Sequence, residues 1–169
     1  MSSAWLFIFA STNLFVIYCD LRSRRVPNSL IVSASIFQLM FLIFNQFGHP
    51  PFSYAATDFS TALLGLSVAL FFFFPLWHFR AMGAGDVKFI AMLALYVGIT
   101  GIVLPVAIGS LLAGVHAFYV IFMRGWIEAR LAWQPVSEGR KGIPYAAYVA
   151  IGALIELVLQ PLQLLSIGT

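Results

Sequence analysis

Charge is scarce in this chain of 169 residues: only 9% of them are Asp, Glu, Lys or Arg, whereas 62% are hydrophobic. An average soluble domain carries about 25% charged residues and about 45–50% apolar ones. A soluble monomer with this composition would expose much of its apolar excess to water, so that class is excluded. Disorder is excluded as well, because a chain with 17 Phe residues collapses. The composition therefore indicates a small integral membrane protein.

Cysteine is nearly absent too, since Cys19 is the one cysteine in the chain. A single thiol excludes both an internal disulfide framework and a cysteine-based metal cluster. The three histidines, His49, His78 and His116, are scattered along the chain and form no metal-binding pattern. We therefore expect neither a metal ion nor another cofactor.

Long uncharged runs predict the membrane spans, because about 20 apolar residues are needed to cross a bilayer as a helix. Prolines and glycines divide these runs, most clearly in the segment 48–53, and Thr57-Asp58 offers an N-cap for the next helix. The fourth predicted helix is short, since about 14 residues at roughly 1.5 Å each reach only about 21 Å. The chain is thus expected to be an all-α polytopic membrane protein with one domain over residues 1–169. Its six helices are predicted at residues 4–21, 29–47, 58–79, 86–99, 102–123 and 143–161.

The basic residues determine the predicted orientation. With six spans, all nine Lys and Arg residues lie on one side of the membrane, whereas a single crossing by residues 89–123 would divide them almost evenly. Basic loops favour the cytoplasmic side, so both termini are expected on the outer side. The net charge of +3 is then a topology signal, and nucleic acid is not an expected partner. The nine residues are Arg22, Arg24, Arg25, Arg80, Lys88, Arg124, Arg130, Arg140 and Lys141.

Ionisable residues in membrane spans are functional candidates, because their burial is costly. Of the six acidic residues, Glu128 and Glu138 fall in the basic loop that follows the fifth span, where solvated charge explains them. Asp58 is explained as a helix N-cap. Glu156 lies in the outer half of the last helix, where a structural hydrogen bond to a neighbouring helix is expected. Two aspartates are left without such an explanation.

These two residues, Asp20 and Asp86, are predicted at the same depth, at the cytoplasmic ends of the first and fourth helices. Two carboxylates that share one proton can carry out hydrolysis, one as the base for water and the other as the acid for the substrate. The alternative is that each carboxylate pairs with a neighbouring Arg or Lys at the interface.

The sequence around Asp86 favours the first interpretation. It reads Gly83-Ala84-Gly85-Asp86-Val87-Lys88, and two glycines before the aspartate let a substrate backbone approach the carboxylate without meeting a Cβ. The start of a helix also favours the ionised carboxylate through the positive end of the helix dipole.

Three stretches of this sequence resemble motifs of the type IV prepilin peptidases, which are membrane aspartic proteases of the Gly-x-Gly-Asp kind. Asp20 is followed six residues later by Val26-Pro27-Asn28, where the family has Ile-Pro-Asn. The family motif Gly-x-Gly-Asp-x-Lys is matched in full by residues 83–88, and Ile143-Pro144-Tyr145 is similar to a late Ile-Pro-Tyr/Phe motif. The order and spacing of these motifs cover nearly the whole chain.

The resemblance implies a function and a site. It makes the substrate a membrane-inserted prepilin, cleaved at the cytoplasmic face of a prokaryotic plasma membrane. Longer members of the family have a cysteine-rich zinc domain and also methylate the cleaved pilin. With one cysteine, this chain is similar to the short, peptidase-only form of Flp-type (tight-adherence) pili, and we expect no methylation. The resemblance makes Asp20 and Asp86 the catalytic pair, supported by motif residues Gly83, Gly85, Lys88, Pro27 and Asn28.

Two other functions remain open. A different intramembrane protease of the Gly-x-Gly-Asp type would share residues 83–88, although the match at Val26-Pro27-Asn28 argues against it. A small solute or ion transporter would use charged residues near the middle of the membrane. Only Glu156 and His116 are candidates for such a path.

Overall fold

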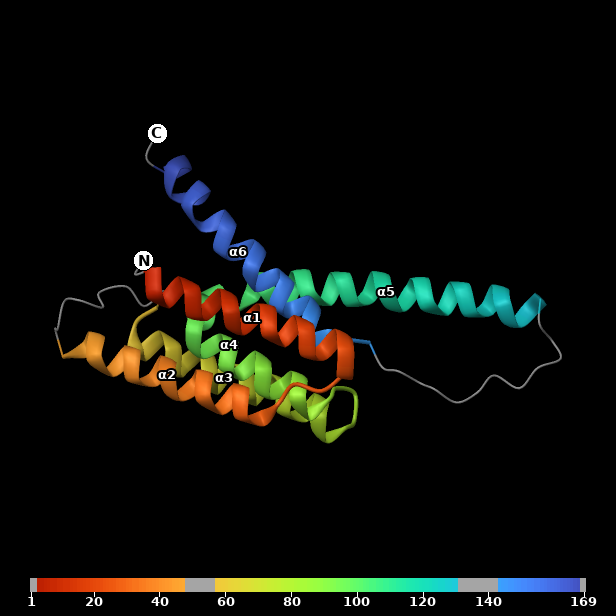
Figure 1. Ribbon diagram of the computed structural model, residues 1–169, viewed down its shortest axis with the longest axis horizontal. Helices are drawn as coiled ribbons and strands as arrows, with labels where there is room; N and C mark the ends of the chain where they lie inside the picture. The colour runs from red at the N-terminus through yellow and green to blue at the C-terminus, as the bar shows by residue number, and fades with distance from the viewer. Residues whose placement is uncertain (1–2, 48–56, 131–142, 168–169) are drawn as a thin grey trace.

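The computed structural model describes residues 3–47, 57–130 and 143–167, and all its regular elements there are α-helices (Figure 1). The all-α prediction is therefore confirmed. The first four helices begin and end within two residues of the predicted bounds. The helices are α1 (Ser3–Ser23), α2 (Asn28–Gln46), α3 (Phe59–His78), α4 (Ala84–Gly101), α5 (Val103–Arg130) and α6 (Tyr145–Ile167).

Five of these helices are long and apolar enough to cross a membrane, which makes the chain a multi-pass membrane protein. They are α1 to α4 and the part of α5 from Val103 to Met123. The fourth helix is longer than the sequence predicts, because it begins at Ala84 and ends at Gly101. Its 18 residues reach the length of a span only across an interruption of the helical backbone at Gly98.

Helix α4 forms the core of the molecule. It packs mainly against α3 and α2, while α6 packs against α5 and α1, and α4 and α6 meet between these two groups (Figure 1). Every residue from Phe89 to Gly98 is buried. Large apolar side chains on the other helices are exposed instead, as at Phe71 and Phe118, where lipid can cover them.

A break in α4 lies at Gly98, whose φ of +75° is a left-handed conformation that a residue with a Cβ adopts only at a cost. A Cβ at Gly98 would also lie 2.5 Å from Thr57 Oγ1. On α3, a Cβ at Gly65 would lie 2.8 Å from the Gly98 carbonyl carbon, so the two backbones touch at this point. Gly65 is thus required by the α3–α4 contact, and Gly98 by its own backbone conformation and the approach of Thr57.

Buried hydrogen bonds connect α1 and α2 with α4 near this break. Gln38 Nε2 donates to the Leu95 carbonyl at 3.4 Å, and Gln38 Oε1 accepts from Trp5 Nε1 at 3.0 Å. Tyr96 donates its hydroxyl to the Ala34 carbonyl at 2.9 Å. Each buried polar group in this network has a partner, which positions α4 relative to the two N-terminal helices.

Helices α5 and α6 approach closely through glycines. A Cβ at Gly109 would lie 2.7 Å from the Val149 Cα, and a Cβ at Gly152 would lie 2.6 Å from the Pro105 carbonyl oxygen. Helix α5 ends at Arg130 and not at residue 123, and its far half extends beyond the neighbouring helices (Figure 1). Helix α6 likewise continues past the predicted end at residue 161 to Ile167. Of the loop predicted after the fifth span, residues 131–142 lie outside the described residues.

Candidate active site

Asp20 lies on the buried face of α1. The buried residues of this helix recur every three or four positions, and Asp20, which is 5% exposed, is the last of them. Its Oδ2 accepts a hydrogen bond from the Ala147 backbone N–H at 2.9 Å. A buried carboxylate needs such a partner, and here the partner belongs to a helix that is more than 120 residues away in sequence.

Asp86 lies in the first turn of α4, for which Gly83 is the N-cap. Its Oδ1 accepts a hydrogen bond from the Ala146 backbone N–H at 3.2 Å, and the Gly83 backbone is a further partner. The carboxylate turns back over Gly83 so closely that a Cβ there would lie 2.9 Å from Asp86 Oδ2. No neighbouring atom lies within 4 Å of a Cβ built at Gly85. The two motif glycines thus differ, since only a Cβ at Gly83 would displace the Asp86 carboxylate.

The two carboxylates meet at the N-terminus of α6. Ala146 and Ala147 follow Tyr145, the first residue of this helix, and the first N–H groups of a helix have no partner within it. Pro144, which precedes α6, has no side-chain oxygen to accept from them. Asp20 and Asp86 supply the acceptors from two other helices and lie within electrostatic range of each other. The positive end of the α6 dipole offsets part of their mutual repulsion.

The segment Val26-Pro27-Asn28 is joined to the Gly-x-Gly-Asp-x-Lys motif by a hydrogen bond from Lys88 Nζ to Asn28 Oδ1 at 3.2 Å. Pro27 is the N-cap residue of α2 and Asn28 its first residue, so this bond attaches the start of α2 to the start of α4. Both side chains are exposed. The structure therefore brings together all three motif segments that the sequence singled out.

Three features of this site cannot be predicted from the sequence. The first is the pair of backbone amides on α6, because main-chain donors are common to all residues. The second is a hydrogen bond of 2.8 Å between Ser110 Oγ and the hydroxyl of Tyr145, which lies within electrostatic range of Asp86. The third is Arg24, whose guanidinium lies within electrostatic range of Asp20.

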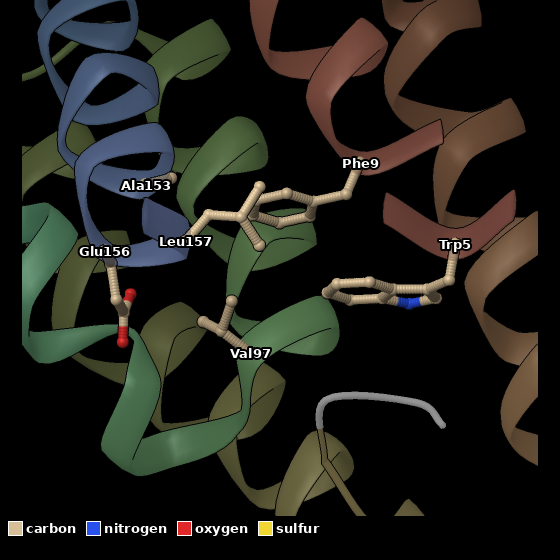
Figure 2. Close-up of a pocket in the computed structure, with 6 residues that line it drawn as sticks. All are labelled: Trp5, Phe9, Val97, Ala153, Glu156 and Leu157. Carbon is tan, nitrogen blue, oxygen red and sulfur yellow. The ribbon is translucent and has the colours of Figure 1, made fainter. Parts of the chain in front are cut away.

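Two predictions for the remaining acidic residues are corrected by the structure. Asp58 is the N-cap of α3 as predicted, but its side chain makes no capping hydrogen bond. Glu156 lines a small pocket together with Trp5, Phe9 and Val97 (Figure 2). Its Oε2 is buried without a hydrogen-bond partner, so the expected bond to a neighbouring helix is not made by this oxygen.

Histidine and carboxylate side chains do not gather elsewhere in the part of the chain that the structure describes. No group of three or more His, Cys, Asp or Glu residues there could hold a metal ion. His116 Nδ1 instead hydrogen-bonds the Tyr148 hydroxyl between α5 and α6. Among the described residues, the Asp20–Asp86 pair is therefore the candidate catalytic cluster.

These observations define a multi-pass helical membrane protein with two carboxylates held at one helix end. The sequence model described as the type IV leader peptidase family matches residues 7–118, more than half of the chain, and the chain belongs to this family. The resemblance predicted from the motifs is thus confirmed, and membership implies a protease with a type IV leader peptidase-like function. No curated protein and no solved structure matches the chain.

Proposed function

We propose that this protein is an aspartic endopeptidase that removes the leader peptide of type IV prepilins, with Asp20 and Asp86 as its catalytic pair. The observation that carries the proposal is the placement of both carboxylates on consecutive backbone N–H groups of α6. Residues 66 positions apart in sequence are held side by side in this way, and both belong to motifs that the family match includes.

The proposed reaction needs one proton shared by the two carboxylates. The ionised carboxylate takes a proton from a water molecule, whose oxygen attacks the carbonyl carbon of the scissile peptide bond. The protonated carboxylate gives its proton to the carbonyl oxygen. When the resulting intermediate collapses, the C–N bond breaks, the leaving amine takes a proton from one carboxyl group, and a hydroxyl of the intermediate returns a proton to the other carboxylate, so that the pair again holds one proton. No covalent bond to the enzyme forms.

The backbone donors suit this chemistry because they are fixed in position and stay protonated. A Lys or Arg in their place would hold the carboxylates by a flexible side chain. The α6 N–H groups instead belong to a helix whose next turns are packed at Val149 and Gly152, so the carboxylate positions follow from the packing of the whole bundle. Such fixed geometry is what a near-attack arrangement requires.

The membrane location of the enzyme restricts which substrates can reach it and from which side they are cleaved. A prepilin is itself a membrane helix with a short basic leader, so it can diffuse laterally and present its scissile bond at the depth of the two carboxylates. The loops after α1 and α3 carry Arg24, Arg25 and Arg80 on the side of the pair, which supports cleavage at the cytoplasmic face. The single cysteine supports the Flp-type, peptidase-only form.

The proposal is tested by cleavage of a Flp-type prepilin in proteoliposomes with Asp20→Asn and Asp86→Asn variants. An Asn side chain still accepts a hydrogen bond from the α6 amides, so each variant should fold and insert. We expect each to lose cleavage by at least about 1,000-fold. Asp58→Asn, an acidic residue at the start of α3, is the control and should cleave as the wild type does. Processing by either site variant at a rate near that of the wild type would refute the catalytic assignment.

A further inference from the structure

One guanidinium nitrogen of a residue within electrostatic range of Asp20 is buried and lacks a hydrogen-bond partner. This atom is Arg24 Nη1. Arg is permanently charged and carries donors in a planar fork, so a buried N–H without an acceptor is costly. The neighbouring arginines avoid that cost: Arg22 Nη1 donates to the Tyr18 hydroxyl at 2.7 Å, and Arg25 is exposed.

The backbone of Arg24 carries a second cost. Its φ is +54°, the left-handed region, directly after the last residue of α1. Glycine is the usual residue at this position after a helix, because it has no Cβ to strain. Arg24 N–H still closes the helix on the Asp20 carbonyl at 3.0 Å, so the conformation is set by the turn into α2. An arginine thus occupies a backbone conformation that glycine would adopt with less strain.

The unpartnered guanidinium nitrogen and the left-handed backbone both belong to Arg24, whose charge lies within electrostatic range of Asp20. Strain and unpartnered polar groups gather at sites where the partner is a ligand. The acceptor that is missing from the protein is therefore expected to come from the substrate.

We propose that the Arg24 guanidinium donates a hydrogen bond from Nη1 to the carbonyl oxygen of the scissile peptide bond. This inference rests on the proposed peptidase function. It adds a catalytic residue, because the donor touches the reacting atoms: it polarises the carbonyl before water attacks and stabilises the charge that develops on oxygen. Arg24 stays protonated throughout, so it exchanges no proton with Asp20 or Asp86.

A carbonyl oxygen fits this position better than a substrate carboxylate does. A carboxylate would bring a further negative charge next to Asp20 and Asp86, which already share one proton. The carbonyl oxygen is neutral when the substrate arrives and becomes more negative as the bond is attacked. A donor aimed at it therefore contributes most in the transition state, which predicts an effect on kcat and not on KM.

The test compares Arg24→Gly with Arg80→Gly. Arg80 has nearly the same backbone, with a φ of +59°, but its side chain is exposed in the turn between α3 and α4. Glycine relieves the left-handed backbone in both variants, so neither should melt at a lower temperature than the wild type. We expect Arg24→Gly to lose about 100-fold in kcat with KM little changed, and Arg80→Gly to cleave as the wild type does.

Arg24→Lys is the second variant. It keeps the positive charge near Asp20 but loses the planar fork, so it should recover part of kcat if the charge acts on the carbonyl oxygen. Prepilin cleavage in proteoliposomes gives kcat and KM, and thermal unfolding in detergent gives the melting temperature of each variant.

Three results would overturn the inference. One is cleavage by Arg24→Gly within about threefold of the wild type, while Asp86→Asn is inactive; this leaves the peptidase function intact. Another is a lower melting temperature for Arg24→Gly than for Arg80→Gly, which assigns Arg24 a structural role. A rise in KM at constant kcat would reduce Arg24 to substrate binding. Failure of the wild type to cleave any prepilin would instead remove the proposed function and this inference together.

Discussion

Single residues at the site differ in what their environment requires of them. Gly83 and Gly85 belong to the same motif, yet only a Cβ at Gly83 would approach a protein atom, Asp86 Oδ2, at 2.9 Å. The first glycine leaves room for the Asp86 carboxylate to turn back over the N-cap. A Cβ at Gly85 would meet no protein atom within 4 Å, so this glycine can matter only for the approach of a substrate.

Replacement of each glycine by alanine separates these roles. Gly83→Ala forces the Asp86 carboxylate to move, and a displacement approaching 1 Å can cost about 100-fold in rate, so kcat should fall by about 10- to 100-fold. Gly85→Ala should stabilise the protein by roughly 0.5–1 kcal/mol, since alanine is the better helix former. Any loss from the second change should appear in KM, because its methyl group can meet only the substrate. Unchanged kcat in Gly83→Ala would show that the carboxylate position does not matter.

At the scale of elements, α6 couples the packing of the bundle to the carboxylate pair. Its first turn donates to Asp20 and Asp86, and its next turns touch α5 at Gly109 and Gly152. A shift of α6 against α5 therefore moves both donors together. This arrangement makes the α5–α6 contact part of the site, although it lies outside the matched motifs.

A methyl group added at the α5–α6 contact tests this coupling. Gly109→Ala places a Cβ 2.7 Å from the Val149 Cα, which is backbone and cannot rotate away, so α6 must shift. We expect a loss of about 1–3 kcal/mol in the free energy of unfolding. Cleavage should fall as well, because the α6 amides move with their helix. Gly114→Ala on the same helix is the control, since nothing lies within 4 Å of its Cβ. Equal behaviour of the two variants would contradict the account.

Most helix ends were predictable because charge, proline and glycine mark where an apolar run stops. The ends of α5 and α6 were not, for a physical reason. Charged residues after Met123 end the apolar span, but they do not break backbone hydrogen bonds, and α5 continues to Arg130. Helix α6 likewise continues past Pro161, where the prediction ends it.

For the site, topology placed Asp20 and Asp86 at one depth, but depth alone does not make two side chains neighbours. Their proximity depends on the backbone amides of Ala146 and Ala147, which any residue except proline would supply. The sequence likewise explains Arg24 as a topology signal, and its burial becomes visible only when the turn between α1 and α2 is built.

On the scale of the whole molecule, five helices in the part of the chain that the structure describes are long and apolar enough to span a membrane, and both aspartates of the pair lie near helix ends. Helix α4 lies in the centre and carries Asp86 at one end and the break at Gly98 near the other. The remaining helices expose apolar side chains on their outer faces.

The single cysteine of the sequence leads to a prediction about methylation. We expect the purified protein to cleave a prepilin without transferring a methyl group to the new N-terminus. Incubation with prepilin and methyl-labelled S-adenosylmethionine, followed by mass spectrometry of the cleaved pilin, checks this. A mass increase of one methyl group on the mature chain would show that the peptidase-only assignment is wrong.

The central claim is that Asp20 and Asp86 act as one catalytic unit. A double-mutant cycle tests it most directly: kcat/KM for prepilin cleavage is measured in proteoliposomes for Asp20→Asn, Asp86→Asn and the variant that carries both. Groups that act as a unit are strongly non-additive, so each single change should remove nearly all activity and the second should add little. A single variant that keeps cleavage near the wild-type value, or losses that multiply in the double variant, would contradict the claim.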